Sequence, residues 1–278
     1  MMITAKINTQ LQHVKGYLFD IDGVLLLGKE PIPGAKELLD ALRQAGKHVL
    51  FVSNTSSRSR AQCIEQFTNA GIEIADEELF LASEETSQYI AKQKPHARAY
   101  VLGAKGLYAE LHKEGIKTLP PENVDSEGID YVVVGRDRTF TYDKLVTAFQ
   151  AITKGAKFVA VNCDPTVPGR KGLEPGAGAI VAALSAMLGR GPDISMGKPA
   201  TLLLEMAAQH RNLQPHECAM VGDTIGVDVV AGNRAGMITI LVLSGNASSE
   251  DLETEIAQGD GKPDLVLSSV RELHELVF

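Results

Sequence analysis

Two aspartates separated by one residue, Asp20 and Asp22, follow an apolar run in the segment "GYLFDIDGVLLLG". In an extended chain alternate residues point to one side, and past the strand end the second carboxylate can turn toward the same small volume. Neighbouring carboxylates raise the pKa of one of the pair unless a cation compensates their charge. An EF-hand is excluded because its glycine is sixth, whereas Gly23 is fourth. The pair is a candidate for catalysis beside a cation, the alternative being a surface turn with incidental acids.

A second polar group, in "FVSNTSSRS", ends another apolar run and precedes a predicted helix. The side chains of Ser53, Asn54 and Thr55, together with the free N–H groups of a helix start, are suited to binding an anion. The alternative is ordinary capping of the helix by a hydroxyl group.

Lys198 lies in "MGKPA", where Pro199 favours the first position of a helix. A Walker loop is excluded, because it requires glycine at position 192 and serine or threonine at position 199, and both are proline. Lys198 is therefore a candidate ligand for an anion, the alternative being one solvated lysine among many.

The segment "MVGDTIGVD" places Asp223 at the end of an apolar strand and Asp228 near the start of the next helix. Acids favour helix N-termini in any protein, which is the simpler explanation of Asp228. Together with Asp20 and Asp22, however, these acids form an oxygen-rich group suited to Mg2+, a hard cation.

The elements that position these residues alternate between short apolar strands and longer amphipathic helices, which predicts an α/β fold with a mainly parallel sheet. Such folds place their ligands at the carboxyl ends of strands, where all four polar groups lie. Strands are expected at 15–20, 47–54, 97–103, 129–135, 156–162, 218–223 and 237–243, and helices near 34–44, 58–70, 105–114 and 141–154.

Composition narrows the class of protein. The chain has 278 residues, 44% of them hydrophobic, and a net charge of −8, so a broad nucleic-acid surface is not expected. The three cysteines are far apart and predict neither a disulfide framework nor a zinc site. The polar N-terminus and the lack of a long apolar run predict a cytoplasmic protein without membrane spans.

In this order the four segments resemble the motifs of the haloacid dehalogenase (HAD) superfamily, most closely the NagD-like and p-nitrophenylphosphatase branch. The segments "VVVGRDRTFTYDKL" and "LEPGAGAIVAAL" are also similar to that branch. The resemblance implies a Rossmann-like parallel-sheet core, residues 1–81 and 191–278, with an inserted α/β cap of the C2 type, residues 82–190. Related capped enzymes often form homodimers through the cap.

The resemblance also implies a role for each motif residue. Asp20 is the expected nucleophile and Asp22 the general acid and base. Mg2+ is expected on Asp20, the Asp22 backbone carbonyl and Asp223, with Asp228 behind these ligands. The phosphoryl group is expected on Ser53, Asn54, Thr55 and Lys198. Val227 stands where related motifs more often carry threonine, so one hydroxyl group is missing from the surroundings of the metal.

The expected function is Mg2+-dependent hydrolysis of a small phosphate monoester, such as a sugar phosphate or nucleotide, through an aspartyl-phosphate. Asp22 disfavours a dehalogenase, because dehalogenase relatives lack this second aspartate. A phosphotransferase or phosphomutase remains an alternative, as does a non-catalytic protein that binds a phospholigand.

The substrate's leaving group must be recognised outside the four motifs, and the middle block is the only large region left. Its loop "NCDPTVPGR" follows a predicted strand, and Asp164 and Arg170 are therefore expected to contact the leaving group. The alternative is that this loop only turns the chain.

Overall fold

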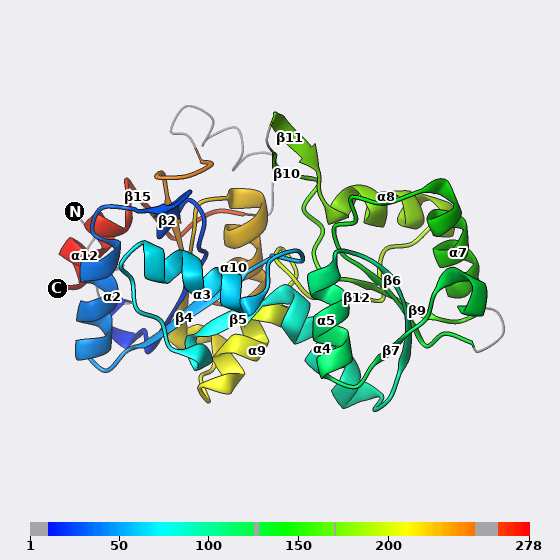
Figure 1. Cartoon of the computed structure of the whole chain (residues 1–278). Helices are drawn as coiled ribbons and strands as arrows, with labels where there is room; N and C mark the ends of the chain where they lie inside the picture. The colour runs from blue at the N-terminus through cyan, green and yellow to red at the C-terminus, as the bar shows by residue number, and fades with distance from the viewer. Residues whose placement is uncertain (1–10, 125–127, 170, 248–260) are drawn as a thin grey trace. The chain divides into compact units, whose positions relative to one another are not determined.

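Buried parallel strands alternate with helices along the chain (Figure 1). The structure is a computed structural model and describes residues 11–124, 128–169, 171–247 and 261–278. The described residues form two units. The first comprises the chain up to Ser53, Arg60–Phe80 and Lys198–Phe278, and the second comprises Asn54–Ser59 and Leu81–Gly197.

Besides Leu81, which was expected in the core but belongs to the second unit, the expected domain boundaries differ from these units at two places. The first is the short segment Asn54–Ser59, which lies before the expected cap, 82–190, but belongs to the second unit. The second is the return to the first unit, which comes at Lys198 and not at residue 191. The limits of the two units therefore depend on contacts between residues that are distant in sequence, which composition does not reveal.

The sheet of the first unit has six strands in the order β15-β14-β13-β1-β4-β5. Its centre, β1, pairs in parallel with β13 and with β4, and Phe19 lies level with both Phe51 and Val221. The carboxyl ends of three strands are therefore side by side. The strands are β1 (Gly16–Phe19), β4 (His48–Ser53), β5 (Leu79–Leu81), β13 (Cys218–Gly222), β14 (Ile238–Val242) and β15 (Leu265–Leu267).

Amphipathic helices cover this sheet, and α2 shows why they form where they do. Leu38, Leu39 and Leu42 recur at helical spacing and are buried, and the helix ends before Gly46, whose φ of 70° suits glycine. α2 packs against α12, and α9 packs against α10. The helices are α2 (Ala35–Gln44), α3 (Arg60–Asn69), α9 (Leu202–His210), α10 (Val230–Ala235) and α12 (Val270–Val277), and a small hairpin joins β2 (Leu26–Leu27) to β3 (Glu30–Pro31).

The second unit has its own parallel sheet of five strands in the order β12-β9-β8-β6-β7. Strands β6, β8 and β9 and helices α7 and α8 supply its apolar core. The strands are β6 (Arg98–Leu102), β7 (Lys117–Thr118), β8 (Tyr131–Val134), β9 (Lys157–Ala160) and β12 (Ile194–Ser195). The helices are α4 (Ala82–Gln93), α5 (Lys105–Lys113), α7 (Tyr142–Thr153) and α8 (Ala177–Leu188).

The α/β prediction is confirmed, while one segment differs from its sequence-based description. Residues expected to form only a loop after β9 contain β10 (Thr166–Gly169), which pairs antiparallel with β11 (Gly172–Pro175). Proline in a sequence argues against a central strand, because it lacks an N–H group for the ladder. In a ladder of only two strands both strands are edge strands, so positions 168 and 175 can be proline.

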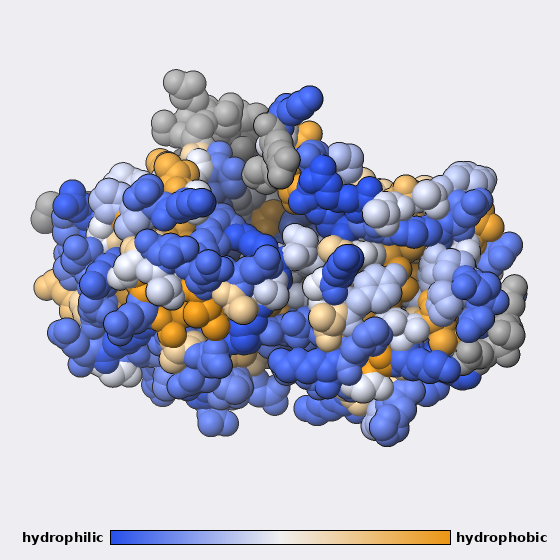
Figure 2. Space-filling model, viewed as in Figure 1, coloured by the Kyte–Doolittle hydropathy of each residue, from blue (hydrophilic) through white to orange (hydrophobic). Residues whose placement is uncertain are grey.

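Hydrophilic residues cover most of the face shown in Figure 2. Among the described residues, no helix combines the length and the apolar character that crossing a membrane requires. The three cysteines, Cys63, Cys163 and Cys218, are free thiols, as predicted.

We expect Leu18→Ala to lower the stability of the first unit by about 2–5 kcal/mol, because the side chain is fully buried in the central strand. Leu27→Ala is the matched control, since its side chain is 65% exposed. Urea unfolding curves of both variants measure the difference. Equal transition midpoints would show that β1 does not anchor the sheet.

Candidate active site

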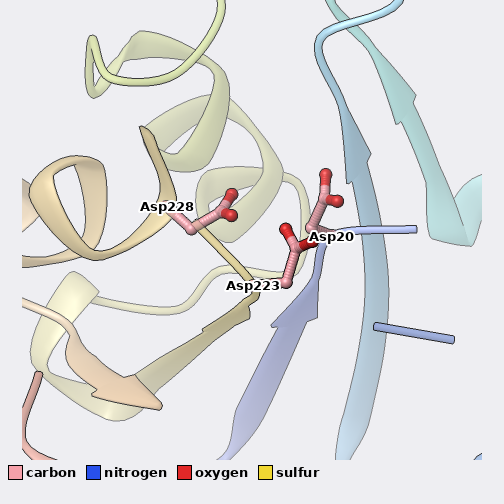
Figure 3. Close-up of side chains that lie close together, drawn as sticks. All are labelled: Asp20, Asp223 and Asp228. Atoms are coloured by element: carbon pink, nitrogen blue, oxygen red, sulfur yellow. The ribbon is translucent and has the colours of Figure 1, made fainter. Parts of the chain in front are cut away.

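Three carboxylates meet at the carboxyl edge of the first unit's sheet (Figure 3). Asp20 directly follows β1, Asp223 directly follows β13, and Asp228 lies in a short π-helix, Ile225–Val229. One oxygen from each of the three lies within 4.8 Å of the other two. Parallel neighbouring strands thus bring together acids that are about 200 residues apart in sequence.

The ammonium group of Lys198 lies against two of these acids. Its Nζ is 2.6 Å from Oδ1 of Asp20 and 2.7 Å from Oδ1 of Asp228, and it also donates to the carbonyl of Val52 at 3.3 Å. The lysine is 1% exposed, so water does not screen these interactions. Burial opposes its charge, but the two carboxylates outweigh that effect, so the pKa of Lys198 is raised and the side chain is cationic.

The carboxylates carry more charge than one lysine neutralises. Burial raises the pKa of Asp20 to about 6, Lys198 offsets part of this rise, and repulsion by Asp228 adds to it. Burial also raises the pKa of Asp223 and of Asp228. Three buried acids around one ammonium group form a site suited to a further cation, and an all-oxygen set matches the ligands that Mg2+ prefers.

The orientation of Asp223 is fixed by residues that the sequence analysis did not identify. Its Oδ2 accepts hydrogen bonds from the backbone N–H of Asn246 at 2.7 Å and from the Asn246 side-chain amide at 2.8 Å. Its Oδ1 accepts from the Thr224 hydroxyl at 3.0 Å. Asn246 follows the predicted strand 237–243, so the strand-end rule used for the other motifs also applies to this position.

Glycines let the backbone pass close to these acids. Gly23 has a φ of 88°, and a Cβ atom there would lie 2.2 Å from Oδ2 of Asp223. A Cβ atom at Gly245 would lie 2.0 Å from the same oxygen, and one at Gly222 would lie 2.1 Å from Cβ of Asp228. All three positions are therefore restricted to glycine by contact, and Gly23 by its backbone conformation as well.

Asp22 lies apart from this acidic group. Among the described residues, the acids close enough to share a metal ion are Asp20, Asp223 and Asp228. The Asp22 side chain is exposed, and its Oδ1 accepts a hydrogen bond from Nε2 of Gln66 in α3 at 3.2 Å. Gln66 also donates to the carbonyl of Gly28 at 3.0 Å. No sequence signal marks Gln66, because it lies inside an ordinary helix.

The residues of the predicted anion group divide between the two units. Ser53 is buried at the end of β4 in the first unit, whereas Asn54 and Thr55 belong to the second. The Asn54 amide donates to Oδ1 of Asp164 at 3.0 Å, so two predicted site residues are brought together within that unit. The Thr55 hydroxyl accepts from the N–H of Arg58 at 3.2 Å. Arg170 lies outside the described residues.

The chain is similar to known proteins over nearly its whole length. Residues 17–117 match the family model of haloacid dehalogenase-like hydrolases, and residues 195–273 match a second HAD-like hydrolase model. The chain is 35% identical to 5'-nucleotidase YutF of Bacillus subtilis over 94% of this chain and 98% of that protein. It is also 35% identical to the acid sugar phosphatase of Staphylococcus aureus, over 88% of this chain and 92% of that one.

Solved structures agree with these relatives. The p-nitrophenyl phosphatase from Archaeoglobus fulgidus superposes with a TM-score of 0.87 at 36% identity, covering 94% of this chain and 98% of that one. NagD from E. coli superposes with a TM-score of 0.81 at 30% identity, covering 93% and 98%. The chain belongs to the haloacid dehalogenase-like hydrolases. Within them it is an enzyme of the NagD-like phosphatase branch, a phosphoric monoester hydrolase.

We expect Gly23→Ala to lower kcat/KM for p-nitrophenyl phosphate about a hundredfold, because the new methyl group displaces the Asp223 carboxylate. Gly28→Ala is the matched control. Gly28 also has a positive φ, 67°, but a Cβ atom there meets no atom within 4 Å. Steady-state kinetics on both folded variants distinguish the effect of the steric clash with Asp223 from the effect of backbone strain, which both variants share. Equal losses in the two variants would contradict this explanation.

Proposed function

We propose that the chain hydrolyses a small phosphate monoester in a Mg2+-dependent reaction in which Asp20 is the nucleophile. The observation that carries this proposal is the buried group of three carboxylates with Nζ of Lys198 at 2.6 Å and 2.7 Å from two of them. A phosphate ester repels an anionic nucleophile, so cationic groups must lie beside that nucleophile before it can attack.

The residues around Asp20 fit a divalent cation. Asp20 and Asp223 are the proposed direct ligands, together with the backbone carbonyl of Asp22, and Asp228 holds Lys198 beside them. The bound ion supplies charge neutralisation for the phosphoryl group. Asn246 and Thr224 keep the Asp223 carboxylate in one orientation, as ordered metal ligands require.

Each chemical step then falls to a side chain of this protein. A carboxylate oxygen of Asp20 attacks phosphorus, and the bond from phosphorus to the ester oxygen breaks, which leaves an aspartyl-phosphate and an alkoxide. Asp22 donates a proton to that alkoxide. It then accepts a proton from water, whose oxygen attacks phosphorus and releases phosphate with Asp20 restored. Lys198 stabilises the negative charge throughout.

The choice of substrate is proposed to lie with the second unit. Ser53, Asn54, Thr55 and Lys198 bind only the phosphoryl group, which all phosphate esters share. Asp164 is proposed to act near the leaving group, with one of its oxygens already occupied by the Asn54 amide. The names of the relatives, a 5'-nucleotidase and an acid sugar phosphatase, support a nucleotide or a sugar phosphate.

We expect Asp20→Asn to lower kcat by about a thousandfold or more, because the amide keeps the shape of the carboxylate but lacks its nucleophilic charge. Asp143→Asn, an exposed aspartate in the first turn of α7, is the control and should keep full activity. Phosphate release from p-nitrophenyl phosphate measures both. A folded Asp20→Asn protein with more than about a tenth of the normal rate would refute nucleophilic catalysis at this residue.

A phosphotransferase of the same family shares the first step and differs in the acceptor. Adding methanol or glycerol to the assay separates the two, because a transferase yields the new phosphate ester in proportion to the alcohol. We expect inorganic phosphate as the main product. A predominant alcohol phosphate would favour the transferase.

We also expect Mg2+ to bind more weakly in acid. With the pKa of Asp20 raised to about 6, a proton competes for this carboxylate below that pH. One competing proton lowers the apparent affinity about tenfold between pH 7 and pH 5. The thermal stability of the protein, measured against Mg2+ concentration at both pH values, reports this shift. Equal half-saturating concentrations would show that Asp20 does not hold the ion.

A further inference from the structure

The second unit contains a pocket of about 400 Å³, a volume typical of small-molecule sites. Its walls come from the segment after β8, from the end of β11 and from the first turn of α8. The residues that line it are Arg136, Asp137, Arg138, Phe140, Glu174, Pro175, Gly176, Ala179 and Ile180.

The charges in this pocket do not balance. Two guanidinium groups, those of Arg136 and Arg138, share a single acceptor, Oε2 of Glu174, with the Arg138 contact at 3.0 Å. Asp137 does not offset the excess, because its Oδ2 forms an ion pair with Lys144 at 2.7 Å. With Lys144 counted, three cationic side chains meet two acids, so this cluster carries one positive charge in excess.

One donor in the pocket wall lacks an acceptor. Nε of Arg136 is buried and has no hydrogen-bond partner among the described residues. A buried N–H group without a partner is unfavourable by about 1–3 kcal/mol and is rare in native proteins. Because this atom is not accessible in the structure, a bound acceptor satisfies it only if the Arg136 side chain turns toward the pocket. The planar guanidinium group is suited to oxyanions.

The remaining lining residues are apolar. Phe140, Pro175, Ala179 and Ile180 face the same pocket as the two arginines. A ligand that satisfies both parts must combine an anionic group with a compact apolar body.

We propose that this pocket is a binding site for a small organic anion, a carboxylate or phosphate group on an apolar body, held by Arg136 and Arg138. This goes beyond the proposed hydrolysis and does not depend on it. The anion can belong to the substrate's leaving group or to a separate small molecule, because both present the same chemistry.

Direct binding of benzoate to the full-length protein tests the proposal, with benzyl alcohol as the uncharged probe of similar size. We expect benzoate to bind at least tenfold more tightly than benzyl alcohol when chemical shifts are followed by titration. Arg138→Gln removes one charge from an exposed side chain, and Ala179→Phe fills the pocket from an exposed position. Each should weaken benzoate binding at least tenfold.

Arg190→Gln is the matched control, because Arg190 is an exposed arginine of the same unit that pairs with Asp193 away from the pocket. Its benzoate affinity should stay within twofold of the wild type. The proposal is overturned if benzoate and benzyl alcohol bind equally, or if both pocket variants keep wild-type affinity. These measurements use no turnover, so they stand whether or not Asp20 is the nucleophile.

Inhibition kinetics with p-nitrophenyl phosphate then identify the source of the anion. If benzoate inhibits competitively and this inhibition is lost in Arg138→Gln, the pocket binds the leaving group of the substrate. If benzoate changes kcat but not KM and this effect is lost in Arg138→Gln, the pocket binds a separate small molecule. Either pattern supports an anion site, whereas inhibition that persists unchanged in Arg138→Gln counts against it.

Discussion

The ammonium group of Lys198 lies buried between the carboxylates of Asp20 and Asp228, and the geometry of the first unit depends on this contact. Removing either kind of partner from such a pair leaves an uncompensated buried charge, which typically destabilises a protein by 3–5 kcal/mol. The lysine and the acids therefore hold each other in place. Because the three acids outnumber the lysine, their arrangement is compatible with a further cation.

The sheet supplies the precision that this arrangement needs. The central strand, β1, pairs in parallel with both neighbours, and its register places Asp20 level with Gly222, one residue before Asp223. The short π-helix then returns Asp228 toward them, and Gly222 leaves room for its side chain. Position along a rigid strand thus places the charged atoms, and the loops contribute the bonds that orient them.

The sequence predicted the parts of this site that follow from local pattern. Asp20, Ser53 and Asp223 each end an apolar run, so the strand-end rule located them. Lys198 and Asp228 were candidates from their places at helix starts, and the motif resemblance assigned their roles. Gln66 was not identified because its role lies in a contact with a distant carboxylate, which neither its type nor its spacing records. Asn246 follows a predicted strand, so the strand-end rule could have located it. The hairpin β10–β11 was not predicted either, because Thr166–Gly169 is a strand only through its pairing with β11.

The segment Asn54–Ser59 has a practical consequence for protein engineering. It is separated from the rest of the second unit by more than twenty residues. Its Ser56 hydroxyl nevertheless accepts a hydrogen bond from the backbone N–H of Arg136 at 3.2 Å. Asn54 likewise bonds to Asp164 and accepts from the Asn162 amide at 2.5 Å. A chimera that takes only residues 81–197 from a relative would combine that relative's segment with Asn54–Ser59 of this protein. Grafting both pieces together keeps each of these hydrogen bonds between residues of one protein.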